Sequence, residues 1–268
     1  MKEQLHLSQI WHYPVKSLKG RSLQTSEVGV TGIQHDRQWM LVDDKGDFIT
    51  QRQEPRMVLV KTDMHHGHLL LSAPGMCDLL VSHGAAGMIP TRAQVWGDET
   101  RALPVDAHAD RWLSEFLQRD CKLVRLPAES PRQVDQTYAQ PADRVGFADG
   151  FPFLLISQAS LDDLNQRLTT SLPMECFRPN LVVSGCEAYA EDNWRRIRIG
   201  EITFRLVKPC SRCVIPGIDL ETGQSQGKEP LRTLAQYRRQ GHKVMFGQNL
   251  LHDWVGSLQL GMHVDVLE

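Results

Sequence analysis

The stretch Ile197-Arg-Ile-Gly-Glu-Ile-Thr-Phe-Arg-Leu-Val207 indicates the architecture of the chain. Its two arms, 197–199 and 202–207, are rich in β-branched and aromatic residues and flank Gly200-Glu201. Two such runs around a glycine-containing turn predict a β-hairpin. The motif Lys208-Pro-Cys-Ser-Arg-Cys213 follows the second arm directly. We therefore expect both of its thiols to lie on a loop that a sheet fixes at one end.

Similar strand-like runs recur along the chain. A second hairpin is predicted where Arg37–Asp43 and Asp47–Arg52 flank the turn Asp44-Lys-Gly46. Further short strands are predicted over residues 5–13, Val58–Thr62, Leu69–Ser72, Leu79–Ser82, Leu181–Val183 and Val264–Leu267. Many short strands at regular spacing are typical of a closed barrel or a sandwich.

Helices are expected at three places between these strands. Asp110–Leu117 places its apolar residues on one face, and Ser157 is a good N-cap for a helix beyond it. Pro230 is expected in the first turn of a third helix that ends near Gly241. The stretch Pro127–Pro141 is the best candidate for a connecting loop. The apolar residues at helical spacing are Trp112, Leu113, Phe116 and Leu117 in the first helix, Leu161, Leu164 and Leu168 in the second, and Leu231 and Leu234 in the third.

The composition is that of a globular protein with a hydrophobic core. Of the 268 residues, 41% are hydrophobic and 23% are charged, and the net charge is −2. These values give no overall basic field, so nucleic acid and anionic membranes are not expected as partners. The start, Met1–Ser8, lacks the apolar core of a signal peptide, and the apolar run Phe151–Ile156 is too short to cross a bilayer. We therefore expect a cytoplasmic protein with no membrane partner.

Three interpretations compete for the pair Cys210 and Cys213. A zinc site needs about four ligands, and the sequence has no second Cys-x-x-Cys. A thioredoxin-like pair should open a helix, which Val214-Ile-Pro-Gly217 cannot continue. The third is a single thiolate ligand to a redox metal, which the cations Arg212 and Lys208 would favour. Two buried thiols in a turn also remain open. The other cysteines are interpreted as small buried hydrophobes, without a disulfide framework: Cys77, Cys121, Cys176 and Cys186.

Basic residues recur at the ends of predicted strands. Lys16 and Ser17 close the stretch Tyr13-Pro-Val-Lys-Ser17, and Arg37 follows His35-Asp36. Arg178 stands before a proline in Phe177-Arg-Pro-Asn180. Guanidinium and hydroxyl groups suit a phosphate through charge-assisted hydrogen bonds. Each residue alone is most simply a solvated surface charge, and only their shared position at strand edges points to an anion site.

Taken together, eight stretches resemble the MOSC family, specifically the subgroup that contains the mitochondrial amidoxime reducing component and bacterial YcbX-type proteins. They run in the family's order and cover nearly the whole chain. The stretches are Tyr13–Ser17, His35–Arg37, Gln51–Arg56, Phe147–Gly150, Phe177–Asn180, Lys208–Cys213, Glu229–Leu231 and Phe246–Asn249.

The resemblance implies a mainly β fold with a few helices. It implies an N-terminal MOSC β-domain over residues 1–120 and a C-terminal MOSC β-barrel over residues 121–268, with the cofactor in the cleft between them. Composition alone places a boundary near residues 100–130. The implied cofactor is the molybdenum cofactor, Mo-molybdopterin. By resemblance, Cys213 is both the catalytic residue and the metal ligand.

The resemblance also assigns the positions that hold this cofactor. Residues that match positions holding the pterin and its phosphate in the family are Lys16, Ser17, Arg37 and Arg178. Ser211 and Arg212 match the residues beside the metal ligand, and Asp149-Gly150-Phe151 matches another cofactor-contacting turn. Phe151 replaces the small hydroxylated residue common there, so only a backbone contact is expected at this position.

By resemblance, the protein is a molybdenum-dependent oxidoreductase that reduces N-hydroxylated compounds, such as amidoximes, hydroxylamines and N-hydroxylated bases. Molybdenum that changes oxidation state can move an oxygen atom together with an electron pair. Some bacterial relatives carry an iron–sulfur domain, but this chain has no cysteine after Cys213 and ends at Glu268. We therefore expect electrons from a separate donor protein, ferredoxin-like, a flavoprotein or of the cytochrome b5 type.

An alternative function keeps the fold and changes the role of the thiol. MOSC modules are also linked to sulfuration of the molybdenum cofactor, so Cys213 could carry sulfur as a persulfide in a cofactor-handling protein. Whether a bound metal cycles its redox state separates the two functions. A non-catalytic β-domain would bind no metal tightly. Pyridoxal phosphate binding is associated with the family as a whole, and no residue discussed above argues for it.

Overall fold

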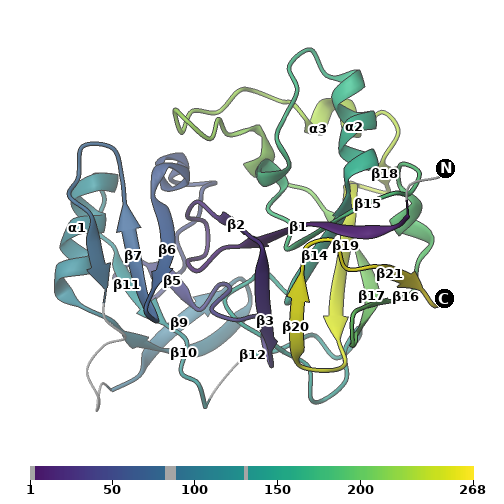
Figure 1. Ribbon diagram of the computed structural model, residues 1–268. Coiled ribbons are helices and arrows are strands. Elements are labelled where there is room, and N and C mark those ends of the chain that lie inside the picture. The colour runs from purple at the N-terminus through teal and green to yellow at the C-terminus, as the bar shows by residue number, and fades with distance from the viewer. Residues whose placement is uncertain (1–3, 82–88, 130–131) are drawn as a thin grey trace.

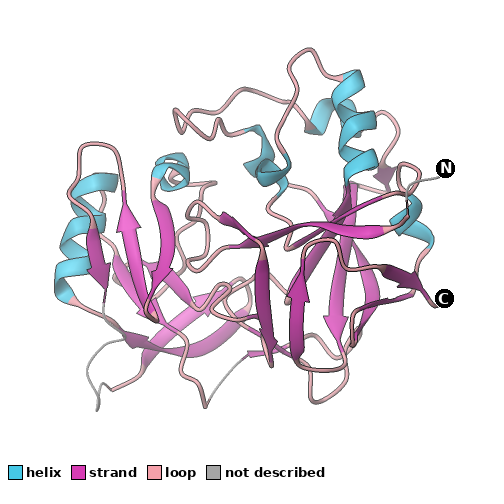
Figure 2. Ribbon diagram, viewed as in Figure 1, coloured by secondary structure: helices cyan, strands magenta, loops and turns pink. Residues whose placement is uncertain are grey.

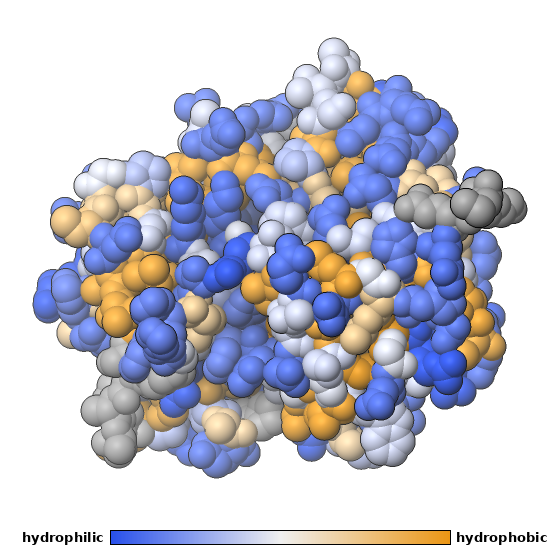
Figure 3. Space-filling model, in the orientation of Figure 1, coloured by the Kyte–Doolittle hydropathy of each residue, from blue (hydrophilic) through white to orange (hydrophobic). Residues whose placement is uncertain are grey.

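The structure, a computed structural model, describes residues 4–81, 89–129 and 132–268. Strands form the centres of two lobes, and the helices lie towards the outside of them (Figures 1 and 2). Both ends of the described chain lie on the same lobe. The face shown in Figure 3 is mainly hydrophilic, with hydrophobic residues in separate areas.

The larger lobe, called the barrel below, is built on a sheet in which the order of strands is β2-β1-β15-β14-β19-β17-β16-β21. His6 bridges His263, next to β21, so this sheet closes on itself. A three-stranded sheet of order β20-β3-β4 accompanies it. The strands are β1 (His6–His12), β2 (Arg21–Leu23), β3 (Thr25–Gly29), β4 (Gly32–Ile33), β14 (Phe153–Ser157), β15 (Leu181–Ser184), β16 (Arg196–Ile199), β17 (Ile202–Ser211), β19 (Lys243–His252), β20 (Gly256–Gln259) and β21 (Val264–Val266), with β18 (Arg239–Gln240) paired to β19.

The smaller lobe contains a sheet of order β5-β11-β10-β9 and a sheet of order β6-β7-β8. Its helix α1 (Ala107–Leu117) buries all four of the apolar residues expected on one face. These side chains join a core that includes Trp39, Leu71 and Leu123. The strands are β5 (Trp39–Val42), β6 (Lys61–His65), β7 (His68–Ser72), β8 (Leu79–Val81), β9 (Thr91–Val95), β10 (Asp98–Pro104) and β11 (Lys122–Arg125).

The chain order does not follow the two lobes. Strands β1 to β4 come early in the sequence, yet β1 pairs with β15 and β3 pairs with β20 in the barrel. Conversely, β11 follows residue 120 and pairs with β5 and β10 in the smaller lobe. The short pair β12 (Arg132–Gln133) and β13 (Arg144–Val145) lies in and after the predicted connecting loop. A division of the chain at residue 120 remains a prediction.

The helices of the barrel lobe differ in how well the sequence indicated them. Helix α2 (Gln158–Arg167) begins where expected, because the Ser157 side chain accepts a hydrogen bond from the Ser160 N–H. The expectation for the third helix was wrong: α3 (Leu231–Leu234) is a single turn, and the chain then forms β18 instead of continuing to Gly241. The 3₁₀ turns are η1 (Pro55–Leu59), η2 (Met174–Phe177), η3 (Ala190–Asn193) and η4 (Ile215–Gly217). Among the described residues, no helix is both long and apolar enough to span a membrane.

Three strand expectations need correction. Val58 lies in η1 and only the end of Val58–Thr62 enters β6, because the proline that opens η1 favours a turn. Asp47–Arg52 forms only isolated bridges, at Asp47 and Phe48. Cys210 was expected on a loop but lies inside β17, which runs on to Ser211, so only Cys213 follows the strand. The last residue of the predicted strand Leu79–Ser82 lies outside the described residues.

Candidate functional site

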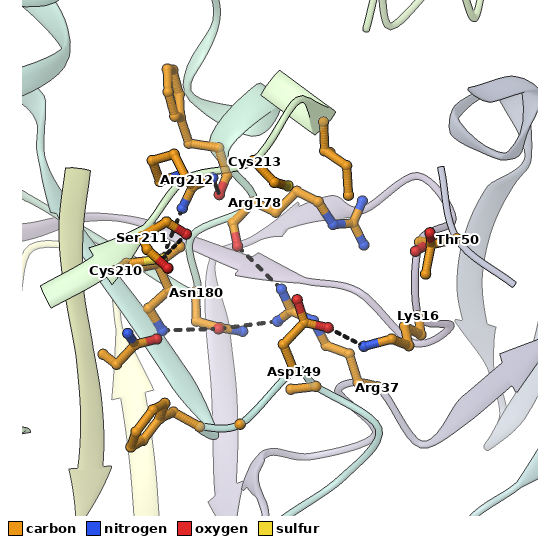
Figure 4. A pocket seen from close by; sticks show the side chains of 18 of the residues that line it. Lys16, Arg37, Thr50, Asp149, Arg178, Asn180, Cys210, Ser211, Arg212 and Cys213 are labelled. Carbon is orange, nitrogen blue, oxygen red and sulfur yellow. Dashed lines mark hydrogen bonds and ion pairs between the residues drawn. The ribbon is translucent and has the colours of Figure 1, made fainter. Parts of the chain in front are cut away.

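All ten residues predicted to bind cofactor or metal line one cavity, although they come from widely separated parts of the chain. Figure 4 shows most of them converging from different elements. The predicted residues in its wall are Lys16, Ser17, Arg37, Asp149, Gly150, Phe151, Arg178, Ser211, Arg212 and Cys213. The structure thus brings the predicted set together, while the role of each member stays a prediction.

Lys16 and Asp149 form an ion pair in the cavity wall. The Lys16 side chain is 6% exposed, and its Nζ contacts an Asp149 oxygen (Figure 4). The same Nζ donates to the Phe147 carbonyl at 2.8 Å. Burial lowers the pKa of Lys16, and Asp149 opposes that shift. Burial alone would raise the pKa of Asp149, but Lys16 and Arg52 together hold it well below its usual range. Asp149 is therefore an anion at neutral pH.

Arg37 and Arg178 share one aromatic neighbour. Each guanidinium lies 4.3 Å from the ring centre of Tyr13, which is buried. Arg37 also donates to Asp36 at 2.5 Å, to the Asn180 side chain at 3.0 Å and to the Arg178 carbonyl at 3.1 Å. The ring and these acceptors fix both guanidinium groups in the cavity wall before any ligand arrives.

Arg178 keeps an unused donor. Its Nη1 donates to the Leu18 carbonyl at 2.7 Å, whereas its Nη2 is buried and has no hydrogen-bond partner. Burial, helped by the charge of Arg37, lowers the pKa of Arg178 to about 10. A buried, unsatisfied, charged donor costs free energy that an anionic acceptor would recover. An anionic ligand that reached this Nη2 would satisfy the donor.

The backbone at three of the predicted residues is in the left-handed region. The φ angles are 66° at Ser17, 46° at Arg37 and 56° at Arg178. Few residues with side chains adopt such angles, and each costs free energy that the surrounding structure must supply. Ser17 and Arg37 lie in turns and Arg178 ends the 3₁₀ turn η2, so this conformation occurs where the chain changes direction.

The thiol of Cys213 meets a cation from the smaller lobe. Arg52 places Nη2 3.5 Å from the Cys213 sulfur and 3.5 Å from an Asp149 oxygen. Arg212 donates to the Cys210 sulfur at 3.2 Å and to the Phe177 carbonyl at 2.7 Å, and its Nε is buried without a partner. Both thiols of the motif thus lie within reach of a guanidinium group.

The other cysteines have different surroundings. Burial raises the pKa of Cys121 to about 11 and that of Cys176 to about 12, and both lie away from the cavity. Cys77 was expected to be buried but is exposed, because its segment follows the turn after β7 at the surface. All six cysteines are free of disulfide bonds.

Several wall residues were not assigned a role from the sequence. Arg52 and Asn180 stand inside stretches that resemble the family, but neither was selected, because an arginine among polar residues and an amide before a strand have many other uses. Asn180 is buried and accepts from both Arg37 and the Leu154 N–H. Thr50 and Asn249 also line the cavity. Only the approach of distant segments identifies these residues.

The wall fits a large anionic group better than a bare metal ion. Within the described ranges, no group of three or more His, Cys, Asp or Glu side chains is placed to hold a metal ion. The cavity presents a soft sulfur ligand at Cys213 and unpaired donors on Arg178 and Arg212. Sulfur suits a redox metal, and guanidinium forks suit a phosphate. These groups fit a cofactor that combines both.

Comparisons with known proteins agree with this description. Residues 4–120 match the MOSC N-terminal beta barrel domain, and residues 142–265 match the MOSC domain. Mitochondrial amidoxime-reducing component 1 from Mus musculus is 36% identical over 97% of this chain and 82% of its own length. The Homo sapiens protein of the same name is 35% identical with the same coverage. Molybdenum cofactor sulfurase from Oryza sativa is 34% identical over 91% of this chain but 32% of its own length.

Proposed function

This chain belongs to the MOSC family, and within it to the group of the amidoxime-reducing components, and we propose on that premise that it is a molybdenum-cofactor-dependent oxidoreductase that reduces N-hydroxylated compounds. The proposed substrates are amidoximes, hydroxylamines and N-hydroxylated bases. The observation that carries the proposal is one cavity that combines the Cys213 sulfur with the unpaired buried donor of Arg178.

In this proposal the cavity wall divides into an anion-binding side and a sulfur side. Arg178 and Arg37 would hold the phosphate of the pterin, and Ser17 would add a hydroxyl and a backbone donor. Cys213 would be the only protein ligand of the metal. The bound cofactor would supply an exchange of an oxygen atom coupled to an electron pair. The protein's own contribution is to position this group and to set the charge around it.

Asp149 and Lys16 set the charge at the middle of the cavity. Because the pKa of Asp149 is held well below its usual range, this carboxylate accepts hydrogen bonds and does not store a proton at neutral pH. Burial lowers the pKa of Lys16, which brings it closer to neutrality than an exposed lysine. Of the two, Lys16 is therefore the better candidate to deliver a proton to a leaving oxygen.

A second candidate function is sulfur transfer to the cofactor. The relative from Oryza sativa named molybdenum cofactor sulfurase supports it, although the match covers only 32% of that protein. Cys213 would then carry sulfur, and Arg52 beside its sulfur would stabilise the persulfide anion. This function requires no redox cycling of bound metal, so the assay below distinguishes the two.

The expectations for partner and location remain proposals. A separate electron-donor protein is proposed from the family resemblance. The cytoplasmic location stays a prediction from the sequence, and the amidoxime-reducing relatives are themselves named mitochondrial. Pyridoxal phosphate binding is not proposed, because the names of the relatives give it no support.

The direct test is an activity assay of protein produced in a host that makes molybdenum cofactor, with reduced methyl viologen as electron source and benzamidoxime as substrate. We expect benzamidine to form, and we expect Cys213→Ser to reduce the rate by at least about tenfold through loss of the metal ligand. Cys77→Ser, an exposed cysteine outside the cavity, serves as the matched control and should keep full activity. Full activity in Cys213→Ser would contradict the proposed ligand.

A further inference from the structure

Two features of the Trp96 position are unusual for a tryptophan: its backbone conformation and its exposure to solvent. It lies in the turn between β9 and β10 with a φ of 56°, in the left-handed region that a bulky side chain rarely adopts. It is also 49% exposed, although an indole gains free energy from burial. The nearby core of the smaller lobe includes Val95 and Ala102 but not Trp96. Packing of the hairpin therefore does not explain this side chain.

Trp96 is not itself among the residues that line the cavity, but it contacts Arg52, which is. The Arg52 guanidinium lies 4.7 Å from the ring centre, and the Phe48 ring meets it edge-on at 5.2 Å. The Trp96 side chain also helps to lower the pKa of the Asp149 carboxyl. The same guanidinium of Arg52 lies 3.5 Å from the Cys213 sulfur. A single guanidinium group thus separates the indole from the proposed metal ligand, and much of the indole surface stays open.

We propose that the open surface of Trp96 is a binding platform for the aromatic ring of the substrate at the mouth of the cavity. This inference rests on the proposed function and names the substrate class that the site prefers. A flat indole in contact with Arg52 and Phe48 favours a planar ring through stacking, and it offers little to a small aliphatic group. The Arg52 guanidinium lies between the indole and the Cys213 sulfur, and its N–H donors suit the oxygen of an N–O group. The site therefore selects N-hydroxylated compounds in which that group is attached to an aromatic or heteroaromatic ring.

The test compares an aromatic with an aliphatic substrate, benzamidoxime with acetamidoxime, in the cofactor-loaded protein. Trp96→Asn removes the ring but tolerates the left-handed backbone, so the variant should fold. Its kcat/KM for benzamidoxime should fall by about tenfold, the value of one stacked ring, and its kcat/KM for acetamidoxime should be unchanged. Trp96→Phe keeps a ring without the N–H and should retain most of the preference. Trp254→Ala, at another exposed tryptophan outside the cavity, is the matched control.

Calorimetric binding of benzamidoxime to the oxidised, loaded protein separates this inference from the proposed function. If binding weakens in Trp96→Asn and no variant shows turnover, the result would contradict the proposed reductase activity and support the role of Trp96 as a platform. If the protein turns over substrate and kcat/KM falls equally for both substrates in Trp96→Asn, the platform would be contradicted and the reductase activity supported. A lower molybdenum content in Trp96→Asn would have the same meaning. Absence of benzamidoxime binding to the wild-type protein would also overturn the platform.

Discussion

At the scale of single residues, backbone carbonyls accept hydrogen bonds from several of the cavity's cations. Lys16, Arg178 and Arg212 donate to the carbonyls of Phe147, Leu18 and Phe177, listed in the same order. A carbonyl satisfies a donor without cancelling its charge, whereas a carboxylate would neutralise it. The carboxylates that touch the cavity cations in the described structure are Asp36 and Asp149. The cavity therefore keeps an excess of positive charge for an anionic ligand.

The buried His12 makes the stability of the protein depend on pH. It is 4% exposed, and burial lowers its pKa from 6.5 to about 4, against the charge of Asp36. Between these values the unfolded chain binds a proton that the folded chain does not, so stability falls as the pH drops. From pH about 7.5 to about 5, His12 should remove about 2 kcal/mol of the free energy of unfolding.

Urea unfolding at several pH values measures this effect. The variant His12→Asn cannot take up the proton, so its free energy of unfolding should decline less steeply towards acid than that of the wild type. His242→Asn, at an exposed histidine, is the control and should follow the wild type. Parallel pH curves for His12→Asn and the wild type would show that His12 does not contribute.

At the scale of elements, the predictions from the sequence were most accurate where neighbouring residues alone determine the structure. The hairpin of β16 and β17 formed around Gly200, which has a φ of 58°, as its turn position suggested. The predicted third helix does not continue beyond Leu234, because the residues that follow have tertiary partners. The strand β18 pairs with β19, and the Tyr237 hydroxyl hydrogen-bonds with that of Tyr189 at 2.9 Å. Such tertiary pairing overrides helix propensity and leaves no local signal.

The N-cap of α2 gives a test at this scale. The Ser157 hydroxyl is fully buried, accepts from the Ser160 N–H at 3.1 Å and lies 2.7 Å from the Ser160 hydroxyl. Ser157→Ala should lower the free energy of unfolding by about 1 kcal/mol or more, because the cap and the buried hydroxyl pair are both lost. Ser171→Ala, at an exposed serine after the helix, should leave it nearly unchanged in the same urea experiment. Equal midpoints for the two variants would argue against the cap.

At the scale of the whole molecule, the site exists because distant segments meet. Lys16 and Arg52 come from the first part of the chain, Asp149 and Arg178 from the middle, and Cys213 from the later part. The resemblance to a family selected most of these positions, since motif residues keep their order in the sequence. Trp96 and Arg52 were not selected, because a lone tryptophan or arginine has no pattern and its role appears only when the smaller lobe meets the barrel. The barrel's use of the earliest strands was likewise not visible, since pairing of β1 with β15 spans most of the chain.

The molybdenum content of purified protein tests the central claim most directly. Protein from a host that makes the cofactor should contain about one molybdenum atom per chain by mass spectrometry. Cys213→Ser and Arg178→Ala should each lower that content by at least about tenfold, since they remove the proposed metal ligand and the proposed phosphate donor. Cys77→Ser should match the wild type. Zinc or no metal in the wild-type protein, or full molybdenum content in both cavity variants, would contradict the account.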